Sequence, residues 1–499
     1  PAEHPIYIRE YRVAGAKHLP KIAVEEAVYP FLGPGRTSHD VEQARAALEK
    51  AYRDKGFQAV NVEVPDQDAR SGVVLLRVNE TTVGRLRVRG ARYFSLAGIK
   101  RGAPSMAEGK VVDFNEVTRD IVRLNRFADR RITPTLSPGV EPGTVDIDLT
   151  VKDSFPLHGS LELNNRNSPD TSALRLNGSL SYSNLWQLGH TLGASFQIAP
   201  QRLEDAKIFS AYYSVPIPWV DWLTLTLQGT KQDSNVSTLG GSASAGRGYV
   251  LGARATITLP AGKEFYESVT LGIDYKHLEQ TLFAGGSTIE SPIEYYPLSA
   301  IYSATWTNKG ALTEFNGGIT FHLRGLGSDP EEFDARRYNS QGSFFYFRGD
   351  LSHTRDLPAE LELFAKVQGQ LSGQPLVDSE QFSGGGLGTV RGYLESEAVG
   401  DNALFGSLEL RSPSLSHLLG EKVVNEWRFY VFGEAGLLEL RDPLPEQKSH
   451  FRLASVGVGT RVQLFEHFNG SLDAGLPLIG QAHTGAHDLL LTFRLWADF

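Results

Sequence analysis

The chain has 499 residues, more than one ordinary domain holds, so we expect it to be divided into several parts. It contains no cysteine, which excludes disulfides and Cys-based metal or catalytic sites, and its net charge of −9 argues against nucleic acid as the main partner. No window approaches the roughly 18 consecutive apolar residues that a membrane helix needs. A membrane location stays open, because a strand in a membrane barrel is apolar on one face only.

The first 80 residues predict a small domain of the order β-α-α-β-β. Residues Ile6–Val13 alternate as a strand does, and a short helical turn over Ile22–Tyr29 follows. Thr37 or Ser38 can cap a longer helix that runs to Lys55 and ends at Gly56. Two strands, Phe57–Val64 and Val73–Val78, complete this domain.

Residues 81–153 repeat that order. The pattern predicts a strand over Val83–Val88, an amphipathic helix over Asp113–Asn125 and two strands over Ile132–Leu136 and Val145–Val151. The repeat of roughly 75 residues has the length of a domain, not of a solenoid unit. The two units resemble a tandem pair of POTRA domains, the periplasmic modules of outer-membrane transporters; two generic α+β domains are the simpler interpretation.

From residue 154 to residue 499, segments of alternating apolar residues are separated by polar, Gly-containing connections. About sixteen strands can be drawn, in keeping with the even numbers of bacterial barrels. Short connections over 186–189, 216–219 and 307–310 alternate with longer ones over 231–248, 279–292, 324–342 and 372–400. We therefore predict an antiparallel transmembrane β-barrel, with an aromatic girdle at strand ends formed by Trp219, Trp222, Tyr295 and Tyr296.

The last residues alternate as one apolar face that ends in an aromatic: Leu489, Leu491, Phe493, Leu495, Ala497 and Phe499. This face resembles the C-terminal signal by which outer-membrane barrels are recognised for insertion, carried here by Phe493, Leu495 and Phe499. A soluble β-sandwich with a chance terminal Phe is the competing interpretation, but it does not explain the alternation of short and long connections.

The connection 372–400 is the sixth long one and contains a glycine run followed by Val390, Arg391, Gly392 and Tyr393. If this loop folds into the lumen, its arginine needs an anion, because a buried unpaired guanidinium is costly. The glycines permit a tight turn with positive φ. Glu434 alternates with the apolar outward series around it, so we expect Glu434 to face the lumen and to pair with Arg391.

Two other interpretations of the glycine run remain. A phosphate-binding loop needs a following Gly-Lys-Ser/Thr and a helix, and neither is present. A glycine-rich surface loop needs no partner for Arg391 at all. The thirteen histidines have no metal-ligand spacing, and no serine lies in a G-x-S-x-G turn, so we expect no catalytic set, metal or cofactor.

The order of these segments resembles the two-partner secretion transporters, the TpsB family of haemolysin secretion and activation proteins, within the BamA-like superfamily. Residues 390–393 resemble the VRGY motif that lies in the sixth loop of that superfamily and folds into the lumen. Phe432, Glu434 and Gly436 resemble its F-x-[D/E]-x-G strand motif.

The resemblance implies a function. A secreted TpsA-like exoprotein, arriving unfolded in the periplasm, would bind the POTRA domains and thread the barrel, while Arg391 latches the sixth loop on Glu434. Candidate binding surfaces are residues 41–64 and 113–136. The other implied partners are outer-membrane lipids and, during biogenesis, the barrel assembly machinery; no nucleotide is implied.

Two other functions compete with export. A BamA-like insertase shares the barrel but usually carries more POTRA domains, and a passive porin needs neither the repeat nor Arg391. The resemblance also implies a plug helix ahead of the first domain, whereas the first predicted strand begins at about Ile6. No basic segment followed by an apolar one precedes that strand, so we expect no signal peptide in the sequence.

Overall fold

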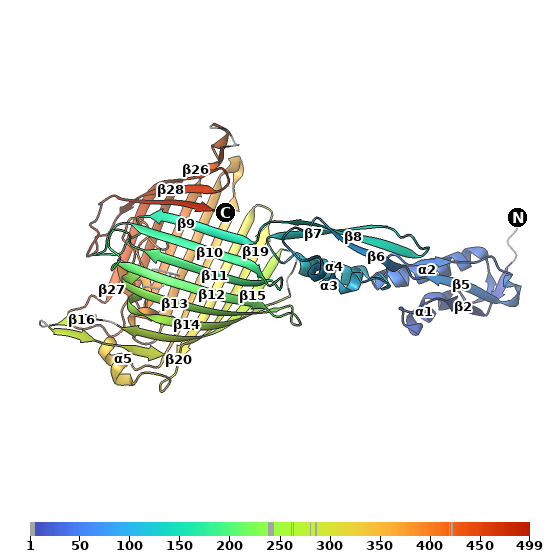
Figure 1. The fold of residues 1–499 in the computed structure, drawn as a ribbon, viewed down its shortest axis with the longest axis horizontal. Helices are drawn as coiled ribbons and strands as arrows, with labels where there is room; N and C mark the ends of the chain where they lie inside the picture. The colour runs from blue at the N-terminus through green and yellow to red at the C-terminus, as the bar shows by residue number, and fades with distance from the viewer. Residues whose placement is uncertain are drawn as a thin grey trace. The chain divides into compact units, whose positions relative to one another are not determined.

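A computed structural model describes residues 5–237, 244–260, 262, 264–279, 281–284, 287–418, 420 and 423–499. The chain divides into two compact units (Figure 1). The first contains residues 1–156 with 186–188, and the second contains the rest.

The first domain is built on a three-stranded sheet of order β2-β5-β4, in which β2 is parallel to β5. Its longest helix, α2, begins after a capping box formed by Thr37 and Asp40, and buries Leu48 and Tyr52 against the sheet. The elements are β1 (Ile6–Ile8), β2 (Glu10–Ala14), α1 (Lys21–Val28), η1 (Tyr29–Phe31), β3 (Gly33–Arg36), α2 (Ser38–Asp54), β4 (Asn61–Glu63), η2 (Ala69–Ser71) and β5 (Val73–Asn79).

Two strand predictions in this domain are wrong in extent. The predicted strand Ile6–Val13 is two strands, broken at Arg9, whose backbone N–H donates to Gly72. The predicted strand Phe57–Val64 is only β4, because Gly56 takes a φ of +101° and the N–H of Phe57 donates to Tyr52. This backbone turn closes the end of α2 and delays the extended chain to Asn61.

The second domain repeats the same topology. Its sheet has the order β6-β8-β7, with β6 parallel to β8. The elements are β6 (Thr82–Arg89), α3 (Leu96–Arg101), η3 (Pro104–Met106), α4 (Phe114–Leu124), β7 (Arg130–Pro138) and β8 (Thr144–Asp153). In both domains the last strand lies at the centre, between a parallel first strand and an antiparallel one, which confirms the repeat.

The second unit is a closed antiparallel barrel, whose strands β9–β15 lie side by side in Figure 1. Over the residues that the structure describes it has sixteen strands, because β18 and β19 both pair with β15 and form one broken strand. These strands are β9 (Leu157–Asn164), β10 (Arg175–Leu185), β11 (His190–Ile198), β12 (Ala206–Pro216), β13 (Leu223–Ser237), β14 (Ser244–Thr258), β15 (Phe265–Glu279), β18 (Ile293–Tyr295) with β19 (Leu298–Asn308), β20 (Ala311–His322), β21 (Phe344–Asp356), β22 (Glu362–Ser372), β25 (Asn402–Arg411), β26 (Val424–Glu439), β27 (His450–Leu464), β28 (Phe468–Pro477) and β29 (Leu490–Asp498).

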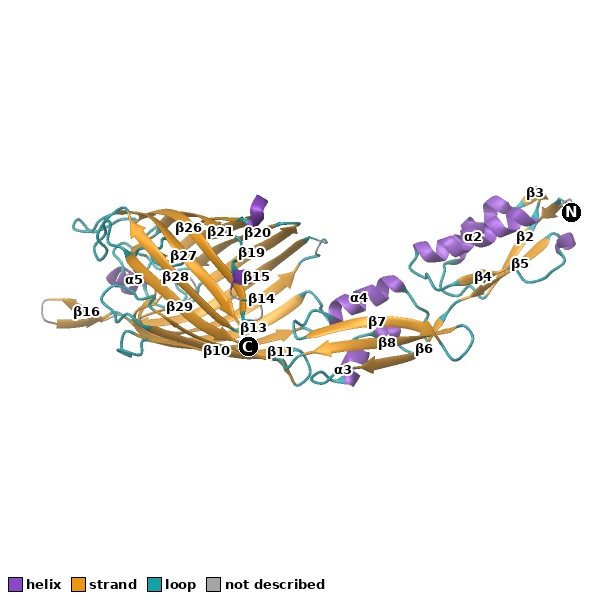
Figure 2. Cartoon of the chain, turned by 90° about the horizontal axis from the view of Figure 1, so that it is seen from above, coloured by secondary structure: helices purple, strands orange, loops and turns teal. Residues whose placement is uncertain are grey.

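The connections carry structure that was not predicted. Residues 231–248, predicted as a loop, mostly extend β13 and β14, and residues 238–243 lie outside the described part. Residues 279–292 contain the hairpin β16 (Thr281–Ala284) and β17 (Ser287–Glu290). Residues 324–342 contain α5 (Pro330–Arg336), which lies with β16 at one end of the barrel (Figure 2). The remaining elements are η5 (Pro358–Glu360), η6 (Asp378–Glu380), β23 (Phe382–Gly384), β24 (Ala398–Gly400) and η7 (Ser416–Leu418).

The girdle prediction is wrong for Tyr295. Trp219, Trp222 and Tyr296 are exposed, but Tyr295 is fully buried beneath α5, with its ring against His322 and Phe333. Consecutive residues of a strand point to opposite faces, so Tyr295 and Tyr296 cannot both lie on the outer face. Among the described residues, no helix is long and apolar enough to cross a membrane.

Candidate functional site

The sixth loop (residues 372–400) turns into the barrel and forms a small hairpin of its own there, in which β23 pairs with β24. Gly385, Gly386 and Gly392 all have positive φ, which only glycine adopts without strain. Val390 is fully buried and packs with Phe382 and Phe405. The loop is therefore part of the barrel's interior packing.

Arg391 lies at the tip of this loop and contacts Glu434 on β26 at three points. Nη2 and Nε donate to Oε1 of Glu434 at 2.7 and 2.9 Å, and the backbone N–H of Arg391 donates to Oε2 at 2.6 Å. Both side chains are almost completely buried. In this geometry the two groups neutralise each other's charge, and the N–H donors of the guanidinium point at the carboxylate oxygens.

Two further carboxylates surround the same guanidinium. Nη1 of Arg391 lies 2.7 Å from Glu409 on β25 and 3.1 Å from Asp473 on β28. The sequence did not identify either residue as part of the site. On the opposite side, the ring of Phe432 lies 3.6 Å from the guanidinium carbon, close enough for a cation–π interaction.

The receiving wall has its own internal contacts. Glu409 also binds Nε of Arg411 at 2.7 Å, the hydroxyl of Tyr430 donates to Asp473 at 2.9 Å, and Ser407 donates to Glu434 at 3.0 Å. These contacts within the wall hold the three carboxylates in the positions where they bind Arg391. Their placement therefore does not depend on the loop alone.

Gly392, Tyr393 and Gly436 shape the contact between loop and wall. The hydroxyl of Tyr393 lies 3.0 Å from the carbonyl oxygen of Ala454 and 2.7 Å from that of Ile479. A Cβ at Gly436 would stand 2.1 Å from the ring of Phe405, so the glycine makes room for that ring. Residues 390–393 thus contact the strands β25 to β28 and the chain after β28.

The predicted C-terminal signal lies on β29, which closes the barrel against β9. Leu495 and Phe499 are exposed on the outer face, and Phe493 pairs with Leu472 of β28. Backbone N–H groups of Phe499 and Gly159 each donate to the other's carbonyl at 3.1 Å. The last residue of the chain therefore pairs with the first strand of the barrel.

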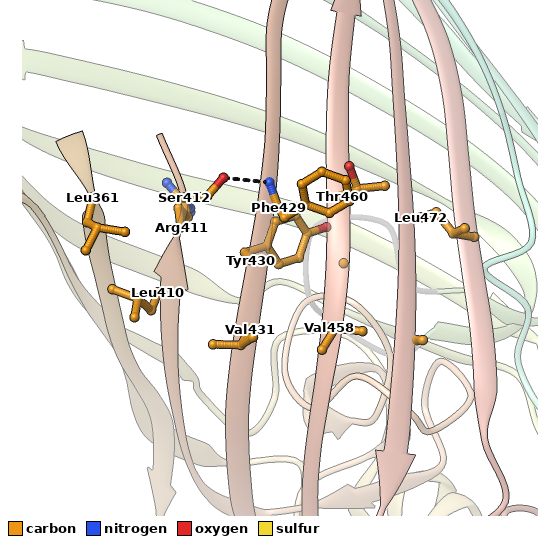
Figure 3. Close-up of a pocket in the computed structure, with 12 residues that line it drawn as sticks. Leu361, Leu410, Arg411, Ser412, Phe429, Tyr430, Val431, Val458, Thr460 and Leu472 are labelled. Atoms are coloured by element: carbon orange, nitrogen blue, oxygen red, sulfur yellow. Dashed lines mark hydrogen bonds between the residues drawn. The ribbon is translucent and has the colours of Figure 1, made fainter. Parts of the chain in front are cut away.

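An apolar groove of about 510 Å³ lies on the other side of the same wall (Figure 3). Its lining includes the outward side chains of Leu410, Phe429, Val431, Val458 and Leu472. Ser412 accepts a hydrogen bond from the backbone of Phe429 at 3.0 Å at its edge. This groove faces away from the lumen and takes no part in the Arg391 site. In the described part of the chain, no three His, Asp or Glu side chains are grouped to hold a metal ion.

Fold and site define a class: an outer-membrane β-barrel transporter with periplasmic POTRA domains. The family described as haemolysin secretion/activation protein ShlB/FhaC/HecB matches residues 143–462, and the ShlB-type POTRA domain matches residues 6–81. The chain belongs to this family, and it is accordingly a TpsB-type secretion transporter of the outer membrane.

Its relatives agree with this membership. It is 23% identical to the outer membrane transporter CdiB of Escherichia coli over 94% of this chain and 78% of the relative. It is 22% identical to CdiB of Dickeya dadantii over 76% of this chain and 67% of that one.

Two solved structures share the fold. CdiB from Escherichia coli, 21% identical, superposes with a TM-score of 0.70, covering 99% of this chain and 91% of that chain. BamA from Haemophilus ducreyi lacking POTRA domains 1–3, 16% identical, gives 0.59, covering 99% of this chain and all of that one.

Proposed function

We propose that this transporter exports an unfolded exoprotein of the TpsA type, which it recognises with its POTRA domains and passes through a lumen held shut by Arg391 on Glu434. The observation that carries the proposal is the burial of a loop arginine among three wall carboxylates. The paired charges hold the loop while they are buried and regain water when the loop moves out, so the contact suits a part that must be released to open a path.

The closed lumen also bears on the state of the cargo. Residues Gln381 to Gly386 of the sixth loop are all buried, and so are Val390 to Tyr393. Loop side chains and wall side chains fill this part of the interior. A loop packed inside the barrel leaves less room for cargo, which supports threading of an extended chain over passage of a folded one.

The first POTRA domain offers a receptor surface. A groove of about 460 Å³ is lined by Val41 and Glu42 on α2, by Val64 and Pro65 after β4, and by Val74. The strand β4 is one of the two edges of its sheet, where a strand of cargo can pair, although the carbonyl of Val62 also accepts a hydrogen bond from Arg45. In the second domain the edge strand β7 carries Pro134 and Pro138, which cannot donate. We therefore favour the first domain as the receptor.

Secretion of a co-expressed TpsA-type exoprotein tests the proposal. Arg391→Ala is expected to abolish or strongly reduce export, while the amount of folded barrel in the outer membrane stays near that of the wild type. Arg247→Ala is the matched control, because Arg247 also pairs with an aspartate, Asp233, but is largely exposed. Unchanged export by Arg391→Ala would remove the latch from the mechanism.

The insertase alternative is tested in the same cells. If the protein inserts other barrels, its deletion lowers the amounts of several outer-membrane proteins and leaves no defect specific to one exoprotein. Loss of one secreted protein alone, with an unchanged outer-membrane profile, supports export.

A further inference from the structure

Besides Arg391, the sixth loop carries the buried acids Glu380, Glu395 and Glu397. Of these, Glu380 lies nearest the start of the loop. Glu380 is 1% exposed, and its Oε1 lies 2.6 Å from Nζ of Lys276 and accepts a hydrogen bond from the hydroxyl of Tyr295 at 2.7 Å. Its Oε2 accepts one from Tyr346 at 2.8 Å. These three partners all lie on strands of the barrel wall. A fully buried carboxylate is stable only with partners of this kind.

The strands that hold Glu380 differ from those that hold Arg391. Lys276, Tyr295 and Tyr346 lie on β15, β18 and β21, whereas Glu409, Glu434 and Asp473 lie on β25, β26 and β28. The charges are also reversed. The loop supplies the carboxylate at the Glu380 contact, and the wall supplies the carboxylates at the Arg391 contact. The charged contacts of Glu380 and Arg391 thus bind the loop to two different sectors of the barrel, and Glu395 adds a contact with Arg166 after β9.

The backbone and the neighbours of Glu380 strengthen the contact. Its carbonyl oxygen accepts a hydrogen bond from Nε2 of Gln370 at 3.1 Å and one from Arg348 at 3.2 Å. Next to it, Asp378 binds Arg336 of α5 at 3.2 Å. The segment Asp378–Gln381 is therefore bound both by strands of the barrel wall and by α5 in the connection 324–342.

From this geometry we infer that Glu380 is a second anchor of the sixth loop, independent of Arg391, and that cargo passes only when both are released. The inference rests on the proposed function, because it concerns the opening of the same lumen. Release of Arg391 removes the charged contact of its hairpin with Glu409, Glu434 and Asp473. The segment Asp378–Gln381 stays bound until Glu380 leaves Lys276, Tyr295 and Tyr346.

Single cysteines can follow the two anchors separately, because the chain has no cysteine of its own. Ser379→Cys reports on the Glu380 anchor: Ser379 is buried, with its Oγ 2.6 Å from the hydroxyl of Tyr295. Ser455→Cys reports on the Arg391 anchor: Ser455 is 1% exposed and lies opposite Glu434 on β27. Both are labelled with a membrane-impermeant maleimide in purified full-length protein. Each reporter is combined with Arg391→Ala, with the neutral pair Lys276→Met and Glu380→Gln, and with all three changes.

Independent anchors give opposite results for the two reporters. Arg391→Ala should raise the labelling rate at Ser455→Cys by roughly ten- to hundredfold, the range for one buried hydrogen bond to a charged group, and leave Ser379→Cys protected. The neutral pair should do the reverse. Equal exposure of both thiols in Arg391→Ala alone would show that the loop leaves as one body. Full protection of Ser379→Cys in the neutral pair would show that Glu380 is not an anchor. Either result overturns the inference.

The design separates misfolding and failure of the proposed function from failure of the inference. The neutral pair leaves no unpaired charge, and heat-dependent gel migration reports whether each barrel is folded. If a barrel with all three changes does not fold, Arg391→Ala and the neutral pair still test whether the anchors are independent. Tyr346→Phe offers a milder change at the Glu380 anchor. Labelling needs no cargo, so a protein that exports nothing would still show two anchors or one.

Discussion

Gly475 on β28 and Gly392 at the tip of the sixth loop meet backbone to backbone: a Cβ on Gly475 would stand 2.6 Å from the nitrogen of Gly392. A Cβ on Gly392 would lie 3.0 Å from the carbonyl carbon of Gly475, and the φ of Gly392 is +91°. Any side chain at either position would push the tip away from the wall. Arg391, one residue earlier, reaches its carboxylates because Gly392 and Gly475 both lack a side chain.

Gly475→Ala is therefore expected to displace the tip and to increase channel opening in planar bilayers toward the level of Arg391→Ala. The matched control is Gly470→Ala on the same strand, where an added Cβ would meet its nearest neighbours at 3.4 Å, an ordinary contact. Equal conductance of Gly475→Ala and Gly470→Ala would contradict the close approach.

Removal of the Arg391 guanidinium should cost barrel stability. Arg391→Ala leaves three buried carboxylates without their cation, and loss of one partner of a buried pair costs about 3–5 kcal/mol. Arg391→Lys should lose less, about 1.5–3 kcal/mol, because an ammonium keeps the charge but cannot bind Glu434 in the same way. The midpoint of heat-dependent gel migration measures both changes, and an Arg391→Lys barrel as labile as Arg391→Ala would contradict this order.

Exchange of the two charges is not expected to restore the contact. In Arg391→Glu with Glu434→Arg, the new acid at position 391 would lie against Glu409 and Asp473, which bind the present arginine at 2.7 and 3.1 Å. Secretion should stay defective in this double variant. Recovery of export to the wild-type level would mean that Glu434 alone determines the contact.

Truncation of Phe499 should weaken closure of the barrel. Its backbone exchanges two hydrogen bonds with Gly159, and its ring covers that glycine, where a Cβ would stand 2.6 Å from the ring. Deletion of Phe499 is expected to reduce the yield of folded barrel in the outer membrane, and Phe499→Tyr should keep most of it. Leu489→Ala, an outward residue before β29, serves as the control for the loss of apolar surface.

The first domain should lose stability in acid through Glu80. Burial raises the pKa of this carboxyl, but hydrogen bonds from the ring and backbone of His18, the backbone of Lys17 and the hydroxyl of Tyr52 outweigh it and leave the pKa below its ordinary value. A lowered pKa stabilises the fold above the unfolded value of about 4.3, and this contribution is lost as the pH falls through the folded pKa.

Hydrogen exchange of β2 and β5 in the full chain measures the effect. Protection should fall between neutral pH and pH values below 4.3 in the wild type, after correction for intrinsic exchange, and the fall should be smaller in Glu80→Gln. Identical pH dependence in the two proteins would contradict the role of Glu80.

Each sequence pattern predicts only those features that depend on residues close together in the chain. Alternation within a strand predicts the face of Glu434, and a capping pattern with Gly56 predicts the ends of α2. Glu409 and Asp473 were missed because their approach to Arg391 depends on the register of strands far apart in sequence, and alternation within one strand carries no such register.

The same reason applies to Glu380. Its partner Lys276 is 104 residues away in sequence, and neither residue stands in a recognisable motif. Acidic residues in long connections are commonly exposed to solvent, and only the packing of the sixth loop shows that Glu380 is buried.

The packed sixth loop has a consequence for the cell that makes this protein. A wide cylinder left empty in the outer membrane would admit bulky antibiotics and detergents that the lipid layer keeps out. Under the proposed function, the sixth loop stays inside the barrel until cargo arrives, so the bacterium would keep the export route in its envelope without a permanent opening of that kind.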